Sequence, residues 1–344
     1  MARRRFLVAI CALACLALGP SIAAAQTDGA PVRKHVNVLS VTGLVDSVVL
    51  DSIYDAIDRA EAEDALTLIL QLDSTGAVVP PDDFEHLITA LDLAKVPIGV
   101  WVGPAGSSAE HAATRLLEPA DLRGRAPGTR VGPGVDHVIQ APTLGDFVVS
   151  LDGVKSRAGV LSTAKVEVNA AGEPRRKPLV DVRFVEPTLM ARLLHIVASP
   201  AVSYLLLLAG AGLVLLELFS LGGGLAAGTA VVCLLLSAYG LAELPTRPLG
   251  LGLMLVAIVA FGVDIQAGTA RFWTALGTLA LLVGTLTLFG RGLDGPVGLP
   301  WPAAAFGILG LLLLVIRAMP SIVRSRTTAG GLNPTALAAA EASE

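Results

Sequence analysis

The sequence predicts an exported α/β domain followed by an all-α membrane domain with several spans. Three features point to this class: a basic and then apolar N-terminal segment, a middle part in which strand and helix patterns alternate, and long apolar runs from about Leu205 onward. Hydrophobic residues make up 53% of the 344 residues, and the mean hydropathy is +0.70. Soluble domains contain about 45–50% apolar residues, so the excess must lie in runs of membrane length.

The N-terminus has the three parts of an export signal. The stretch "MARRR" is basic, "FLVAICALACLALG" is apolar, and "AAAQ" offers a small-residue cleavage site after Ala25. We therefore expect residues 1–25 to be a signal peptide and the domain that follows to be extracytoplasmic. An uncleaved anchor is the alternative, and "RRRFL" fits both a twin-arginine signal and the general export route.

Strand and helix patterns alternate between residues 36 and 125. The runs "VNVLSVTG", "ALTLILQLD", "VPIGVWV" and "ADLRGRAPG" read as strands, and the second is continuously apolar. Apolar residues at helical spacing lie between the strands, the third helix being "SAEHAATRLLE". This alternation predicts βα units and a mostly parallel sheet. Sites in such folds gather at the carboxyl ends of the strands, here residues 72–77 and 103–111.

Residues 135–198 are expected to form a β-rich extension and a linker to the membrane. Alternating polar and apolar residues with turns at "LDGVK" and "NAAGEP" predict a small antiparallel sheet. The basic run "RRK" at 175–177 is interpreted as a solvated turn, with contact to anionic headgroups as the alternative.

The C-terminal half contains apolar runs that approach the ~20 residues needed to cross a bilayer. They lie at about 201–219, 225–242, 249–263, 272–289 and 299–316. Five crossings in the membrane domain, residues 199–319, would put the tail 320–344 in the cytoplasm, where we expect it to be disordered. The third run is short, so four crossings stay open. Glu217 lies near the end of the first run, and a structural use is favoured over transport.

Composition argues against several kinds of partner and cofactor. The net charge is −4 and the pI is about 5.8, which disfavours nucleic acid as a partner. No cysteine lies between residues 26 and 200, so neither a disulfide framework nor a cysteine metal site is possible there. The five histidines share no ligand spacing such as H-E-x-x-H, so we expect no metal and no cofactor.

Four stretches in order carry a resemblance to a known family. They are "LDSTGAVV", "VGPAGSSAEHAATRLL" with "ADLRGRAPGTRVGP", "PTLGDFVVSLDG", and the membrane entry "VEPTLMARLLHIVASPAVSYLLLLAGAGLVLLELFSLGGG". Over about residues 35–290 the chain resembles the NfeD family, also described as membrane-bound serine proteases of the ClpP class. The resemblance implies a ClpP/crotonase-like fold for residues 26–134, here truncated, and a multi-pass protein of a bacterial plasma membrane.

The family's catalytic residues do not carry over onto this chain. His111 occupies the place of the family's nucleophilic serine, and the family's oxyanion loop corresponds to residues 73–77, with Gly76 and Ala77 as the oxyanion-loop equivalents. The helices that carry the family's catalytic lysine have no counterpart after "APGTRVGPG". A Ser–Lys dyad needs both groups within hydrogen-bond reach, and neither is where the family places it.

Two alternatives remain for residues near this position. Ser107 or Ser108 would be a displaced nucleophile, but a serine at the start of a helix is usually an N-cap, and this interpretation is favoured. His111 would be a base in a new site, but a lone histidine beside Glu110 is more often structural.

These observations favour a catalytically inactive membrane scaffold or partner-binding protein over an enzyme. The alternative is a membrane-bound serine endopeptidase with a displaced dyad. The expected partners are the lipid bilayer and a second copy of the chain. The resemblance also implies a stomatin- or prohibitin-like membrane protein, although the chain ends without the family's C-terminal OB barrel.

Overall fold

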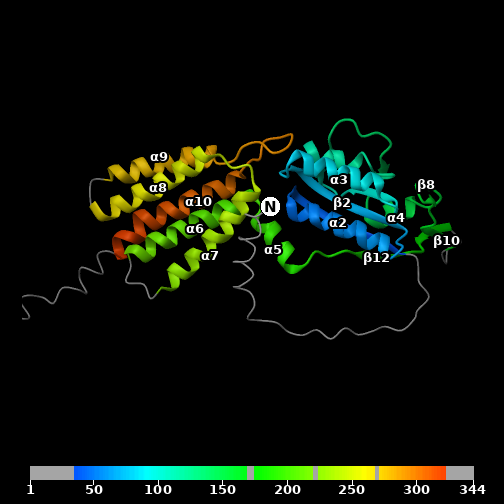
Figure 1. Ribbon diagram of the computed structural model, residues 1–344, viewed down its shortest axis with the longest axis horizontal. Coiled ribbons are helices and arrows are strands. Elements are labelled where there is room, and N and C mark those ends of the chain that lie inside the picture. The colour runs from blue at the N-terminus through cyan, green and yellow to red at the C-terminus, as the bar shows by residue number, and fades with distance from the viewer. Residues whose placement is uncertain (1–34, 169–173, 220–223, 268–270, 323–344) are drawn as a thin grey trace, which may run out of the picture. The chain divides into compact units, whose positions relative to one another are not determined.

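The computed structural model describes residues 35–168, 174–219, 224–267 and 271–322, which form an α/β domain and a set of apolar helices (Figure 1). An α/β domain followed by a helical membrane region is the fold class that the sequence predicts, and it is confirmed. The signal peptide expected at 1–25 and residues 323–344 of the expected tail lie outside the described residues. The limits of the individual domains stay predictions.

The α/β domain is built on a parallel sheet with the strand order β12-β1-β2-β3-β5-β7. The bounds of these strands are β1 His35–Val45, β2 Thr67–Ala77, β3 Ile98–Val102, β5 Leu122–Arg125, β7 Ile139–Gln140 and β12 Asp181–Phe184. All the pairings along this path are parallel, as the alternating pattern predicts. The edge strands β7 and β12 come from residues 135–198, so this segment completes the sheet on both sides.

Helices cover both faces of the sheet, which explains why the central strands are continuously apolar. Helices α2 (Ser47–Ala62) and α3 (Pro81–Leu93) pack on one face through buried residues such as Ile53 and Phe84 (Figure 1). On the other face, α4 (Leu144–Ser150) packs Phe147 against Trp101 and Ile69. A side chain at Gly124 would meet the Phe147 ring at 2.4 Å, so this glycine permits the close approach of α4.

Two antiparallel hairpins lie outside the main sheet, as expected for residues 135–198. Strands β8 (Lys155–Ser156) and β9 (Gly159–Val160) form one, and β10 (Ala164–Val168) and β11 (Pro174–Pro178) form the other. The side chains of the "RRK" run lie outside the described part of the structure, so its interpretation stays a prediction.

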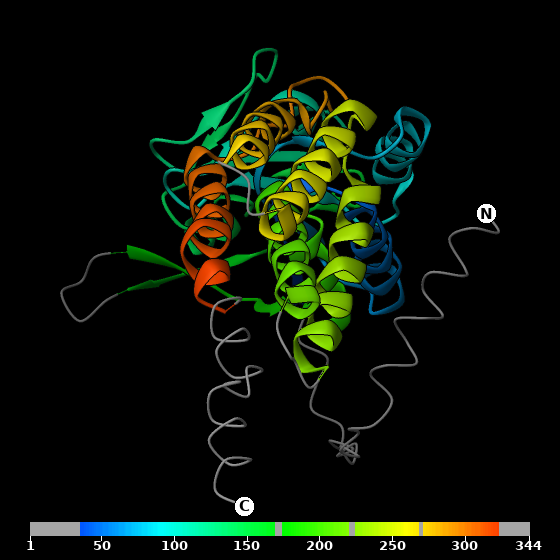
Figure 2. The same ribbon diagram turned by 90° about the vertical axis from the view of Figure 1, so that its left-hand side faces the viewer.

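The membrane region consists of apolar helices packed side by side (Figures 1 and 2). Their bounds are α6 Pro200–Phe219, α7 Leu225–Glu243, α8 Pro248–Ala267, α9 Phe272–Thr287 and α10 Trp301–Leu313. The helix that begins with α10 continues to Ile322 through a π-helical segment at Leu314–Ala318. In the described chain, four helices are long and apolar enough to cross a membrane, and α9, with 16 residues, is shorter.

The expectation that the third apolar run is the short one is wrong. This run forms α8 with 20 residues, and the fourth run forms the shorter α9. Asp264 lies inside α8, and its carboxylate accepts a hydrogen bond from Thr274 Oγ1 of α9 at 2.5 Å. Glu217 of α6 likewise accepts from the backbone N–H of Gly224, which begins α7, at 3.2 Å. This contact supports the structural use favoured for Glu217.

Candidate functional site

The structure brings together the two loops in which the sequence places a site. The short strand β4 (Ser108–Ala109) pairs with the end of β2 through Ser74 and Ala109, and with β6 (Arg130–Val131) on its other side. The backbone N–H of Ser108 donates to Asp73 Oδ1 at 2.9 Å. The carboxyl ends of β2 and β3 therefore form one surface, as parallel topology requires.

His111 faces residues 73–77, the loop that the resemblance aligns with the family's oxyanion loop. It follows β4 after Glu110 and has a φ of +51°, in the left-handed region that few non-glycine residues adopt. A methyl group at Gly76 would lie 3.8 Å from the Cβ atom of His111. The residues aligned with the family's nucleophile and oxyanion loop are therefore neighbours in space. Their roles stay predictions.

The interpretation of Ser107 and Ser108 as helix N-caps is wrong. The expected helix is a 3₁₀ helix, η1 (His111–Leu117), which is preceded by Glu110, whereas Ser108 lies in β4. Pairing with β2 and β6 holds these residues extended, so tertiary contacts override the local helical pattern. Both serines are buried, with 4% and 3% exposure. Among the described residues, neither hydroxyl is hydrogen-bonded to a histidine, a lysine or a carboxylate.

The loop between α9 and α10 lies over His111 and the end of β2. Its residue Leu293 donates a backbone N–H to the carbonyl of Ala77 at 3.0 Å. A methyl group at Gly295 would lie 2.9 Å from the His111 ring, so this glycine lies directly against the imidazole. This contact could not be predicted from the sequence, because "GRGLDGPVGLP" reads only as a break between two apolar runs.

A cavity of about 640 Å³ extends from His111 toward α5 (Leu189–Val197). His111, Glu110 and Thr75 line one part of it, and Asp46 and His195 line another. Two histidines thus share one cavity, although they are 84 positions apart in the sequence.

His195 is held by two hydrogen-bond acceptors. Its Nδ1 lies 2.7 Å from Asp46 Oδ2, and its Nε2 lies 2.9 Å from the carbonyl oxygen of Thr42. Because both partners accept, the arrangement favours a ring with a proton on each nitrogen. The hydrogen bond to Asp46 raises the pKa of His195 above its ordinary value. The other oxygen of Asp46 caps α2 by accepting from the N–H of Val49 at 2.8 Å.

The sequence analysis did not single out the pair of His195 and Asp46. An aspartate before a helix is a recognisable N-cap signal, which would have placed Asp46 at the start of α2. Its partner lies 149 residues away, and no local pattern reveals such a contact.

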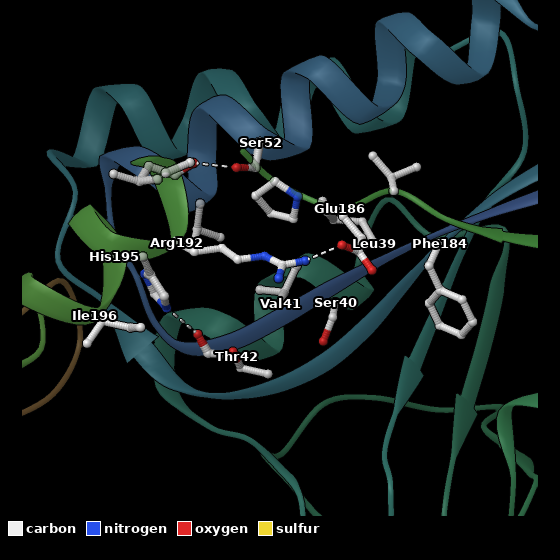
Figure 3. A pocket seen from close by; sticks show the side chains of 15 residues that line it. Leu39, Ser40, Val41, Thr42, Ser52, Phe184, Glu186, Arg192, His195 and Ile196 are labelled. Atoms are coloured by element: carbon white, nitrogen blue, oxygen red, sulfur yellow. Dashed lines mark hydrogen bonds and ion pairs between the residues drawn. The ribbon is translucent and has the colours of Figure 1, made fainter. Parts of the chain in front are cut away.

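A second cavity of about 410 Å³ lies between β1, α2, α5 and the residues after β12 (Figure 3). Its walls are mostly apolar, and Leu39, Val41 and Phe184 contribute to them. In Figure 3, Arg192 extends from α5 to Glu186, and the two side chains form an ion pair at 2.5 Å.

Comparison with known proteins matches the membrane half to a family model and relates most of the chain to a protease. Residues 201–319 match the family model of the NfeD integral membrane domain. The membrane-bound protease PH1510 of Pyrococcus horikoshii is 23% identical over 311 residues, which cover 76% of this chain and 70% of that protein.

The chain is also similar to solved structures. One is a mutant of the 1510-N membrane-bound stomatin-specific protease in complex with a substrate peptide, with 17% identity and a TM-score of 0.38 over 48% of this chain and 97% of that chain. Another is the 1510-N membrane protease specific for a stomatin homolog from Pyrococcus horikoshii, with 20% identity and a TM-score of 0.38 over 48% and 98%. The sequence match and the membrane domain together give the identification: the chain is an NfeD-like membrane protein related to a membrane-bound protease.

Proposed function

We propose that this NfeD-like membrane protein uses its α/β domain to bind a partner and does not hydrolyse peptides. The observation that carries the proposal is the environment of His111. This residue takes the place of the nucleophile, and Gly295 lies against its ring. Covalent hydrolysis needs a hydroxyl or thiol with a base beside it and room for the scissile carbonyl.

The neighbouring groups support an inactive site. Ser107 and Ser108 are buried, so their hydroxyls have little access to a peptide. An oxyanion hole requires N–H groups that point into the reaction space. At the equivalent loop, the N–H of Gly76 contacts Ser74 Oγ at 3.4 Å, and the carbonyl of Ala77 accepts from Leu293.

The α/β domain would act outside the cytoplasm, in the orientation that the N-terminal signal predicts. A stomatin- or prohibitin-type membrane protein, which the family resemblance implies, is the partner to test first. The related 1510-N protease is described as specific for a stomatin homolog. A second copy of the chain is the other candidate partner.

A serine endopeptidase is the competing function, because PH1510 is a membrane-bound protease. The two functions are separated by incubating the full-length protein in nanodiscs with a fluorophosphonate serine probe and with unstructured peptides. We expect neither labelling nor cleavage. Cleavage that is lost in Ser107→Ala or Ser108→Ala would overturn the proposal and establish a displaced nucleophile.

Partner binding is tested separately by crosslinking. The full-length protein is co-reconstituted with a stomatin-type protein, and bifunctional crosslinking reagents are applied. We expect crosslinks between the two proteins. Crosslinks only between copies of this chain would point to self-association instead.

A further inference from the structure

Helix α5 has two opposite faces with different surroundings. Ala191 and His195, four residues apart, lie on the face toward β1 and α2, where they line the cavity shown in Figure 3. Leu189 and Leu193 lie on the other side of the helix and are 78% and 58% exposed. Ile196, one helical turn beyond Leu193, is 53% exposed, although it also lines this cavity. The helix thus presents an apolar stripe, centred on Leu189 and Leu193, that stays exposed in the described chain.

The position of α5 along the chain places it at the edge of the bilayer. It ends at Val197, and the apolar helix α6 begins at Pro200. A helix of 20 residues is about 30 Å long, which matches the hydrocarbon core, so Pro200 must lie close to one boundary. The three peptide steps from Val197 to Pro200 span at most roughly 11 Å, which keeps the end of α5 near that boundary.

Specific contacts fix which face of α5 is exposed. The hydroxyl of Ser203 on α6 donates to the carbonyl of Val197 at 2.6 Å. The backbone of α7 also approaches closely, because a methyl group at Gly240 would lie 2.3 Å from the same carbonyl. On the side of α5 that faces α2, His195 is hydrogen-bonded to Asp46. The helix therefore cannot rotate to bury Leu189 and Leu193 without breaking these contacts.

We propose that α5 is an interfacial helix whose stripe of Leu189, Leu193 and Ile196 inserts into the lipid at the bilayer boundary. Amphipathic helices with one apolar face lie in this way between headgroups and acyl chains. Lipid is the occupant because the stripe continues directly into a matched membrane domain that starts at residue 201. The helix thereby couples the α/β domain to the membrane surface.

The proposal is tested with a single fluorophore on the full-length protein in phosphatidylcholine and phosphatidylglycerol nanodiscs. The native Cys11, Cys15 and Cys233 are replaced by serine, and an NBD dye is attached at Leu193→Cys. The matched control is Leu93→Cys at the end of α3, which is 75% exposed and lies at the amino-terminal edge of the sheet. That edge is opposite the one that contacts the α9–α10 loop.

At position 193 we expect a blue-shifted emission, quenching by doxyl-labelled lipids and protection from aqueous iodide. At position 93 we expect quenching by iodide and little by lipid. If the dye at 193 behaves as it does at 93, the stripe faces water and the proposal is wrong. Protection from both quenchers would mean that a protein covers the stripe, which also overturns it. The outcome does not depend on whether the α/β domain is catalytically active.

Discussion

His195 of α5 and Asp46 at the start of α2 form a hydrogen-bonded pair with 2.7 Å between Nδ1 and Oδ2. Through its two oxygens, Asp46 links the α5 contact to the cap of α2. This pair attaches α5 to the α/β domain at the start of α2.

The first prediction is that this attachment weakens as the pH rises. The pKa of His195 is higher in the folded protein than its ordinary value of 6.5. A raised folded pKa gives stability that is fully present below the unfolded pKa and is lost as the pH rises through the folded pKa. Asp46 is the acid that faces the ring, while Glu110 and His111 line the same cavity.

This prediction is checked by hydrogen exchange of the α5 amides in wild type and His195→Gln between pH 5 and 9. We expect slower exchange in wild type at low pH, beyond the intrinsic pH effect that is common to both proteins, and convergence at high pH. His86→Gln, which changes an exposed histidine on α3, is the control and should match wild type throughout. A wild-type advantage that grows with pH would contradict the sign.

The second prediction concerns Arg157, whose guanidinium donates hydrogen bonds to several loops. It pairs with Asp121 at 2.8 Å and donates to carbonyls at the end of α3, among them Leu91 and Ala94. Removing it leaves partly buried acceptors without a partner. Hydrogen bonds to charged groups contribute about 1.5–3 kcal/mol each, so we expect Arg157→Met to lower the stability of the α/β domain by about 3 kcal/mol.

Thermal unfolding of the detergent-solubilised protein measures this effect. Arg157→Lys should recover only part of the loss, because an ammonium lacks the planar fork of donors. Arg183→Met is the control, since this side chain is 57% exposed and has a single long contact of 3.8 Å to Glu63. Equal midpoints for Arg157→Met and Arg183→Met would refute the role given to Arg157.

Sequence reasoning recovered the parts of the fold that depend on local pattern. Continuous apolar runs identified β2 and β3, because strands covered on both faces carry little polar alternation, and a β-rich run ended by Gly43 identified β1. The edge strand β12 has four residues, three of them exposed, and offers no such signal. Its place beside β1 depends on a pairing across about 140 residues, such as His35 with Asp181.

The candidate site was predicted only in part, for the same reason. The resemblance located His111 and Gly76, and the sheet topology brought them together. The other contacts of the site join residues that are far apart in the sequence. Gly295 lies against His111, and His195 is hydrogen-bonded to Asp46. At Ser108 the local sequence predicts a helix, but the residue pairs with β6 as part of a strand instead.

The third prediction is that the chain crosses the membrane five times. Three glycine contacts show that α9 runs back along α8: Gly250 lies against Leu288, Gly284 against Met254, and Gly277 against Phe261. The two helices are therefore antiparallel, and if α8 crosses the bilayer, α9 must cross back. Its 16 residues span about 24 Å, which local thinning of the bilayer accommodates.

Reporters and labelling check this topology. A reporter of the cytoplasmic type fused after Glu344 should be active, and a membrane-impermeant maleimide should reach Ser150→Cys from outside the cell. The native cysteines are replaced by serine for the labelling. Four crossings would place the reporter and position 150 on the same side of the membrane.

The last prediction is that His111→Ser does not create a peptidase. The substitution supplies a hydroxyl, but a serine needs a base within hydrogen-bond reach, and we expect the helices that carry the family's lysine to have no counterpart in this sequence. Loss of a single oxyanion-hole donor costs roughly 10²–10³ in rate, and loss of the base adds to it. The Gly295 loop would still lie over the new side chain.

We therefore expect His111→Ser in nanodiscs to show the same background cleavage of unstructured peptides as wild type and as His111→Ala. The matched comparison is important, because the alanine variant opens the same space without a hydroxyl. Turnover in His111→Ser alone would mean that a base is available near position 111 after all. It would also mean that the Gly295 loop moves aside for a substrate, so that a single side chain at position 111 separates this protein from proteolysis.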